Sequence, residues 1–297
     1  MDISNSILSY KSYLNRRNYC APTVKRYLND LKQFLLWVDV PIEQVCEERI
    51  AVYIDHLLYE RKHPKTINCH LTAIRKFYEY LREQGHVESK NPVKRGSWLR
   101  MPKPLPKYLK DDQVEYLLQK VTKPRDRAIF ILMLRAGLRV SEVAGLTFAD
   151  MDFRNGRLLV REGKGRKERL VYMSKDFLQS LTDYVRSRPA SPDKHVFLVE
   201  KGTCRGKSLS VRGIQKRMEY YARQAGLQAS LHQLRHTMAT NLLNAGAHLA
   251  TLQDLLGHAS VVTTQRYCKV SNLRVQQDYY KAMEKVMQTT DGKLPSP

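Results

Sequence analysis

Residues 232–237 read His-Gln-Leu-Arg-His-Thr, and the interpretation of the second half of the chain starts from this stretch. It leads into a segment whose apolar residues recur at helical spacing over 234–243, which predicts a helix. A histidine or an arginine taken alone is more often structural than chemical. A chemical role for this stretch can therefore be inferred only together with the patches that precede and follow it.

Four such patches surround the stretch. Residues 137–142 read Gly-Leu-Arg-Val-Ser-Glu, and residues 163–169 read Gly-Lys-Gly-Arg-Lys-Glu-Arg. Downstream, residues 255–258 read Leu-Leu-Gly-His and residues 263–267 read Thr-Thr-Gln-Arg-Tyr. The second patch lies between two runs of strand character, 158–161 and 169–172, so it predicts the turn of a hairpin with Lys164 at the tip.

The rest of the pattern is helical. In the second half, helices are expected at 111–119, 125–136, 177–186, 211–225, 249–255 and 273–287. In the first half, four short amphipathic stripes begin at Ile7, Val24, Ile50 and Ile67, the last ending near Gly85. We therefore expect an α+β chain, mainly α with a small β-sheet, that starts with an all-α bundle.

Prolines mark the expected boundary between two domains. Pro102, Pro104 and Pro106 fall within five positions, cannot continue a helix and favour an extended connection. We expect one domain over 1–97, a linker over 98–107 and a second domain over 108–297.

The net charge points to a polyanionic partner. Lysine and arginine number 51 against 29 acidic residues, a balance of +22, and phosphate neutralisation makes nucleic acid the usual target of such a protein.

The five cysteines are scattered without paired spacing, which argues against a zinc site and a disulfide framework. No apolar run is long enough to cross a bilayer, and residues 1–5 lack the pattern of a signal peptide, so we expect a cytoplasmic, nucleoid-associated protein.

The five patches, in this order, resemble the tyrosine recombinase or phage integrase family, and most closely its Xer-like and transposon-encoded site-specific recombinases. The resemblance covers nearly the whole chain. It implies an N-terminal four-helix SAM-like core-binding domain and a C-terminal tyrosine recombinase catalytic domain. It also implies cleavage and rejoining of DNA through a 3′-phosphotyrosyl intermediate, without a cofactor or a metal.

The chemistry explains why these residue types occur. When a hydroxyl attacks a phosphodiester, the pentacoordinate phosphorane carries extra negative charge, which preorganised arginines stabilise with two hydrogen bonds each. The resemblance gives this role to Arg139 and Arg235, and makes Tyr267 the nucleophile. It makes Lys164 the general acid, with His232 assisting deprotonation and His258 donating to a phosphate oxygen.

Two further sets of residues are open to two interpretations. Glu142 either orients Arg139 or a nearby histidine, or caps a helix N-terminus after Ser141. Basic residues on the second and fourth helices form either a solvated surface or a DNA-facing one, whereas two linker lysines are expected to follow the phosphate backbone. These DNA-binding candidates are Lys25, Arg26, Lys32, Arg75, Lys76, Lys103 and Lys107.

The resemblance also implies an assembly. Two double-stranded DNA sites would be bound by a homo-oligomer, a dimer on each site and a tetramer in the synapse, with an accessory protein or partner recombinase left open. The apolar stripe of 273–288 could pack on its own domain, but the resemblance favours docking on a neighbouring subunit, and this is what we expect. We expect strand exchange between two short sites through a Holliday junction, in mobile-element integration or resolution, with Xer-type chromosome dimer resolution as the alternative role. The alternatives of a different class are relaxation by a type IB topoisomerase and a non-catalytic DNA-binding regulator.

Overall fold

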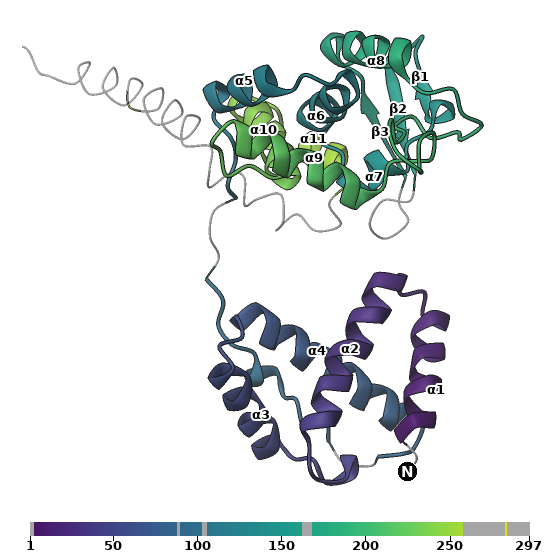
Figure 1. Cartoon of the computed structure of the whole chain (residues 1–297). Coiled ribbons are helices and arrows are strands. Elements are labelled where there is room, and N and C mark those ends of the chain that lie inside the picture. Colours follow the sequence, from purple (N-terminus) through teal and green to yellow (C-terminus); the bar gives the residue numbers. More distant parts are fainter. Residues whose placement is uncertain (1–2, 88–89, 103–105, 162–167, 258–282, 284–297) are drawn as a thin grey trace, which may run out of the picture. The chain divides into compact units, whose positions relative to one another are not determined.

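The structure, a computed structural model, describes residues 3–87, 90–102, 106–161, 168–257 and 283 (Figure 1). The chain divides into two compact units, Met1–Lys103 and Pro104–Pro297. Helices make up most of the described residues, together with one small sheet, so the expected α+β class is confirmed.

The N-terminal unit contains the four predicted helices. They are α1 (Ile3–Arg16), α2 (Ala21–Trp37), α3 (Glu47–Tyr59) and α4 (Pro64–Glu83). Their apolar stripes meet in a core rich in aromatic rings, where Tyr10 packs edge-on against Phe77 and Phe34 against Tyr53. Helix α4 begins at a proline, which lacks the N–H that would be left unpaired at that position.

The segment after α4 belongs to the same unit. The Arg75 guanidinium donates to the carbonyl of Val93 at 2.9 Å, and the Asn68 side chain both accepts from and donates to the backbone of Leu99. Trp98 also packs on this core. The first two residues of the predicted linker 98–107 therefore pack on the N-terminal unit, and hydrogen bonds to Asn68 also hold Leu99 there.

Helix α6 (Pro124–Ala136) is the centre of the C-terminal unit. Residues 128–134 are all buried, and α6 packs against α8 (Lys175–Ser187) and α10 (Leu231–Asn244) (Figure 1). A helix that is apolar on every side is expected only in the middle of a core. It ends at Gly137, whose φ of +63° is the left-handed conformation that glycine adopts easily.

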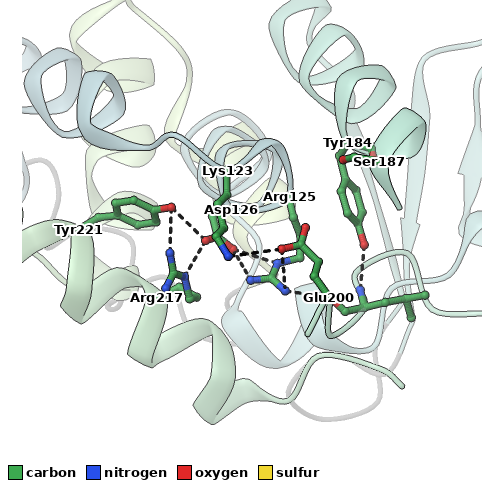
Figure 2. Close-up of polar contacts among 9 residues, drawn as sticks. Lys123, Arg125, Asp126, Tyr184, Ser187, Glu200, Arg217 and Tyr221 are labelled. Carbon is green, nitrogen blue, oxygen red and sulfur yellow. Dashed lines mark hydrogen bonds and ion pairs between the residues drawn. The ribbon is translucent and has the colours of Figure 1, made fainter. Parts of the chain in front are cut away.

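A buried charge cluster fixes the first turn of α6. Figure 2 shows Asp126 between two arginines: Arg125 donates twice to Oδ1, at 2.7 and 2.9 Å, and Arg217 donates to Oδ2 at 2.7 Å. Tyr221 also donates to Oδ2, at 3.2 Å. Arg217 and Tyr221 come from α9 (Val211–Gln224), so this fully buried carboxylate links α6 to α9.

The sheet has three antiparallel strands in the order β1 (Met151–Asp152), β2 (Arg157–Val160) and β3 (Arg169–Tyr172). The β2–β3 pair is the predicted hairpin, and in its register Val160 lies opposite Arg169. The predicted turn, with Lys164, lies outside the described residues.

The remaining helices complete the unit. Helices α5 (Asp111–Lys120) and α11 (Leu249–Leu256) match predicted segments, whereas the five-residue α7 (Val140–Ala144) was expected only in the capping interpretation of Glu142. The helix predicted at 273–287 falls outside the described residues, apart from residue 283.

Candidate active site

Four of the predicted site residues are described and lie together. Arg139, Glu142, His232 and Arg235 come from α7 and α10, two elements that the sequence separates by about ninety residues, a distance typical of a site assembled by the fold. Lys164, His258 and Tyr267 lie outside the described residues.

Arg139 occupies the N-cap position of α7, two residues after the left-handed Gly137. Its Nη1 donates to Oε1 of Glu142 at 2.7 Å. Its Nη2 lies 3.2 Å from the carbonyl oxygen of Gly257 and 3.4 Å from that of Leu256. These hydrogen bonds fix the guanidinium, and because about a quarter of the side chain is exposed, it still reaches the surface.

Arg235 is held in a similar way but is more deeply buried, with 2% exposed. Its guanidinium donates to the carbonyl oxygens of Gly137 and Leu256. These oxygens lie at the C-terminal ends of α6 and α11, where backbone carbonyls lack helical partners and the helix dipole favours a cation. The ends of two helices thus fix the guanidinium through uncharged acceptors.

Glu142 binds two arginines at once. Its Oε2 accepts from the backbone N–H of Arg139 at 2.7 Å, which caps α7, while its Oε1 accepts from the side chain of the same residue. Arg169 donates to both oxygens, at 2.9 and 2.8 Å. Glu142 therefore makes the contacts that both interpretations expect, since it caps the helix and binds the Arg139 side chain.

The environment keeps Glu142 ionised. Burial on its own would raise the pKa of this carboxyl. The hydrogen bonds and charges of Arg169 and Arg139 outweigh burial and lower its pKa to about 2.

Arg169 was quoted in a sequence patch without a role, and the structure brings it into the site. It lies at the start of β3 with 7% of its side chain exposed, and its Nε donates to the carbonyl oxygen of Leu255 at 2.7 Å. A signal for it existed: in a strand, residues two apart share a face, so Arg169 faces inward with the fully buried Val171. A charged residue on an inward face requires a buried partner.

Gly257 ends α11 beside these arginines. Its φ is +59°, and an added Cβ would lie 3.0 Å from Cδ of Arg169. A side chain at this position would meet both a backbone penalty and a neighbour that is already bound on three sides.

His232 lies in the first turn of α10, with its ring 4.1 Å from that of His236. Although the residue reaches the surface, the atoms packed around it lower the pKa of His232 by desolvation, and the positive charges of Arg235 and Arg139 lower it further. A histidine with a lowered pKa is neutral at pH 7, so it can accept a proton.

Two histidines outside the sequence motifs have local roles. His195 binds Asp193 at 2.6 Å within a loop, and His248 occupies the N-cap position of α11. Within the described ranges, no three His, Cys, Asp or Glu side chains lie close enough together to hold a metal ion.

The DNA-binding candidates fall into two groups. Lys25, Arg26, Lys32 and Lys107 are exposed. Arg75 and Lys76 are half-buried and both bind Glu79, at 3.1 and 2.7 Å, while Arg75 also bonds to Val93 as described above. Arg75 thus has a structural task within its unit. Lys103 lies outside the described residues.

Two known family descriptions match this chain, one over each unit. Residues 107–274 match the Phage integrase family, and residues 7–85 match the Phage integrase, N-terminal SAM-like domain. The chain belongs to the phage integrase family. The SAM-like and catalytic domains expected from the sequence are both confirmed.

Curated relatives from this family match over nearly their whole length. Tyrosine recombinase XerA of Thermococcus kodakarensis is 32% identical over 285 residues, covering 95% of this chain and 97% of the relative. Tyrosine recombinase XerC of Thermodesulfovibrio yellowstonii is 34% identical over 271 residues, covering 88% and 89%. Tyrosine recombinases of the integrase family are DNA strand-transferases, so the expected enzyme class is confirmed.

Solved structures share the fold. A lambda integrase dimer bound to a COC′ core site has a TM-score of 0.73 at 17% identity, covering 89% of this chain and 97% of that one. The Tn1549 transposon integrase in complex with circular intermediate DNA has a TM-score of 0.71 at 19% identity, covering 88% and 94%.

Proposed function

We propose that this phage integrase family member is a site-specific tyrosine recombinase that cleaves DNA by forming a bond between Tyr267 and a 3′-phosphate. The observation that carries the proposal is the anchoring of Arg139 and Arg235 to the same helix end, beside His232, whose pKa is lowered by desolvation and by these two arginines. Two fixed cations next to a proton acceptor suit a reaction in which negative charge develops on a phosphate.

The cleavage step balances without a cofactor. The Tyr267 oxygen forms a bond to phosphorus while the bond from phosphorus to the 5′-oxygen breaks. His232 takes the tyrosine proton, and Lys164 gives a proton to the leaving 5′-oxygen. Arg139, Arg235 and His258 bind the non-bridging oxygens.

Strand exchange follows from the same intermediate. The phosphotyrosyl bond stores the energy of the phosphodiester, so the free 5′-hydroxyl of a partner strand can attack it and reseal the DNA. Exchange of one strand pair gives a Holliday junction, and exchange of the second pair resolves it. A lambda integrase tetramer has been solved bound to a Holliday junction. We infer a dimer on each site and a tetramer in the synapse, with segment 273–288 docking on a neighbouring subunit.

We propose integration or resolution of a mobile element as the biological role, on the strength of the +22 charge. Chromosome dimer resolution is the second candidate, favoured by the curated relatives named XerA and XerC. A transposase gene beside inverted repeats would support the first role. Chromosome dimers accumulating in a deletion strain would establish the second.

No helix in the described part of the chain is long and apolar enough to cross a bilayer. We infer that the protein acts on DNA in the cytoplasm, associated with the nucleoid.

We also propose a set of basic residues that contact the DNA phosphates. They are the exposed Lys25, Arg26, Lys32 and Lys107, together with Lys103 and the less accessible Lys76.

The direct test is the variant Tyr267→Phe. It should bind the recombination site as tightly as the wild type but form no covalent protein–DNA complex, measured as a band that persists in denaturing gels. Retained cleavage by this variant would disprove the nucleophile. Relaxation by the wild type of plasmids that lack any special site would favour a topoisomerase.

The general acid has its own test. Lys164→Ala should slow cleavage, and a substrate with sulfur at the bridging 5′ position should restore the rate, since a thiolate leaves without a proton. Absence of rescue would remove this role from Lys164.

A further inference from the structure

Each of the three guanidinium nitrogens of Arg169 is hydrogen-bonded within the site. Its Nε donates to the Leu255 carbonyl at 2.7 Å, and its two Nη atoms donate to the two oxygens of Glu142 at 2.9 and 2.8 Å. With 7% of its side chain exposed, it is shielded from solvent far better than Arg139, which has 26% exposed. We infer that it serves the scaffold of the site and does not itself contact DNA.

The hydrogen bonds fix the plane of the Glu142 carboxylate. Oε1 lies between Nη1 of Arg139 and Nη1 of Arg169, while Oε2 lies between the Arg139 N–H and Nη2 of Arg169. Paired parallel bonds from a planar guanidinium restrict rotation of a carboxylate much more than a single bond does. The orientation that Glu142 gives to Arg139 therefore depends on Arg169.

Charge gives Arg169 a second effect. If Glu142 bound Arg139 alone, the negative carboxylate would offset the positive charge that Arg139 presents to a phosphate. With Arg169 present, three groups carry a net charge of one positive unit, and charges interact strongly where water is scarce. Because Arg169 balances the charge of Glu142, the positive charge of Arg139 can still act on a bound phosphate.

We propose that Arg169 is a positioning residue for DNA cleavage: through Glu142 it orients Arg139 and preserves its charge for the scissile phosphate. This inference rests on the proposed function. It also links the base of the hairpin, where Arg169 pairs with Val160, to the end of α11.

The experiment compares Arg169→Met with the wild type in single-turnover cleavage of a nicked recombination site, beside DNA binding measured by fluorescence anisotropy. Cleavage at saturating DNA should slow by roughly 10- to 100-fold, because small misplacements of catalytic groups have effects of this size. Affinity should change by less than about twofold, as expected for a group that contacts no phosphate. Arg169→Lys, which keeps the charge but not the paired bonds, should be intermediate and gives a second variant should the methionine variant fold poorly.

Arg217→Met is the matched control. Arg217 also donates to a buried carboxylate, that of Asp126, but in the cluster of Figure 2 on α9. It should lower the melting temperature without slowing cleavage below that temperature. Equal slowing in both variants would show a general structural effect and overturn the proposal.

Two readouts separate positioning from stability. In the double variant with Glu142→Gln, loss of Arg169 should add less than about threefold, because both changes break one unit. Among the described residues, Arg139 from α7 and Arg169 from β3 bond directly to Glu142, so Arg169→Met should raise the pKa of this carboxyl, measured by NMR of glutamate-labelled protein. Arg217→Met, which leaves both of these bonds in place, should not change it.

Fully additive losses, or an Arg169→Met rate within twofold of an active wild type, would overturn this inference and leave the proposed function intact. Absence of covalent complex with the wild type would overturn both.

Discussion

Arg139 and Arg235 share one acceptor: each donates from its Nη2 to the backbone carbonyl oxygen of Leu256. The two side chains come from α7 and α10, and the oxygen lies at the end of α11. The separation between the two cations is therefore set by a third element. Changes at this helix end should affect catalysis even where they remove no catalytic side chain.

The first prediction concerns Gly257. Gly257→Ala should lose about 1 kcal/mol of stability from the left-handed backbone and should also slow cleavage, because the new Cβ would press on Arg169. Gly226→Ala is a close control: its φ of +61° nearly equals the +59° of Gly257, but nothing lies within 4 Å of its added Cβ. Urea unfolding and single-turnover cleavage measure the two effects. The idea fails if both variants cleave at the same rate.

The second prediction follows from Glu142. Its pKa in the folded protein, about 2, lies below the ordinary 4.5, so its contribution of roughly 3 kcal/mol is present above pH 4.5 and is lost as the pH falls toward 2. Glu142→Gln should therefore destabilise the protein at pH 7, and the difference from the wild type should shrink between pH 4.5 and 3.

Urea unfolding at several pH values measures this difference. The exposed Glu219→Gln, whose partner Arg212 lies at 3.5 Å, should change stability by less than about 0.5 kcal/mol throughout. A Glu142→Gln difference that stays constant down to pH 3 would contradict the pKa assignment.

The third prediction concerns His232. In the protein without DNA, its ring should titrate below 6.5, because burial and the charges of Arg235 and Arg139 all disfavour the protonated form. Arg139→Gln should raise the midpoint, since it removes one of these charges. NMR of histidine-labelled protein measures it, with the resonance assigned by His232→Asn. A midpoint at or above 6.5 in the wild type would argue against a neutral proton acceptor.

The fourth prediction concerns the cluster in Figure 2. Asp126→Ala should cost about 3–5 kcal/mol, because it leaves Arg125 and Arg217 without their shared carboxylate. Asp183→Ala breaks only exposed contacts, a pair with Arg186 at 3.8 Å and a hydrogen bond from Gln179 at 3.1 Å, and should cost less than about 1 kcal/mol. Equal losses, measured by urea unfolding, would mean that the cluster does not stabilise the fold.

The sequence located the long elements because their patterns are strong. The apolar run 128–134 became the buried α6, and the runs around the Gly-Lys-Gly turn became β2 and β3. Helix α7, with five residues, and strand β1, with two, are too short for periodicity to reveal. Both depend on tertiary contacts.

In the site, too, some residues could be predicted from the sequence and others could not. Motifs identified Arg139 and Arg235, because arginine is the residue type that the chemistry requires. They could not identify the oxygens that hold these arginines, since every residue has a carbonyl and no residue type marks the useful one. Arg169 could have been predicted from the sequence as a buried residue that needs a partner, because strand alternation places it on the inward face.

The shared anchor also determines which mutations can expose it. A main-chain oxygen is present whatever side chain occupies position 256, so an alanine scan would report only the packing of a buried leucine there. The anchor depends instead on where α11 ends. Each residue in an α-helix turns the backbone by about 100°, so one inserted or deleted residue between Leu249 and Leu256 would point a different carbonyl at the arginines. At this place the chain tolerates a change of side chain better than a change of length.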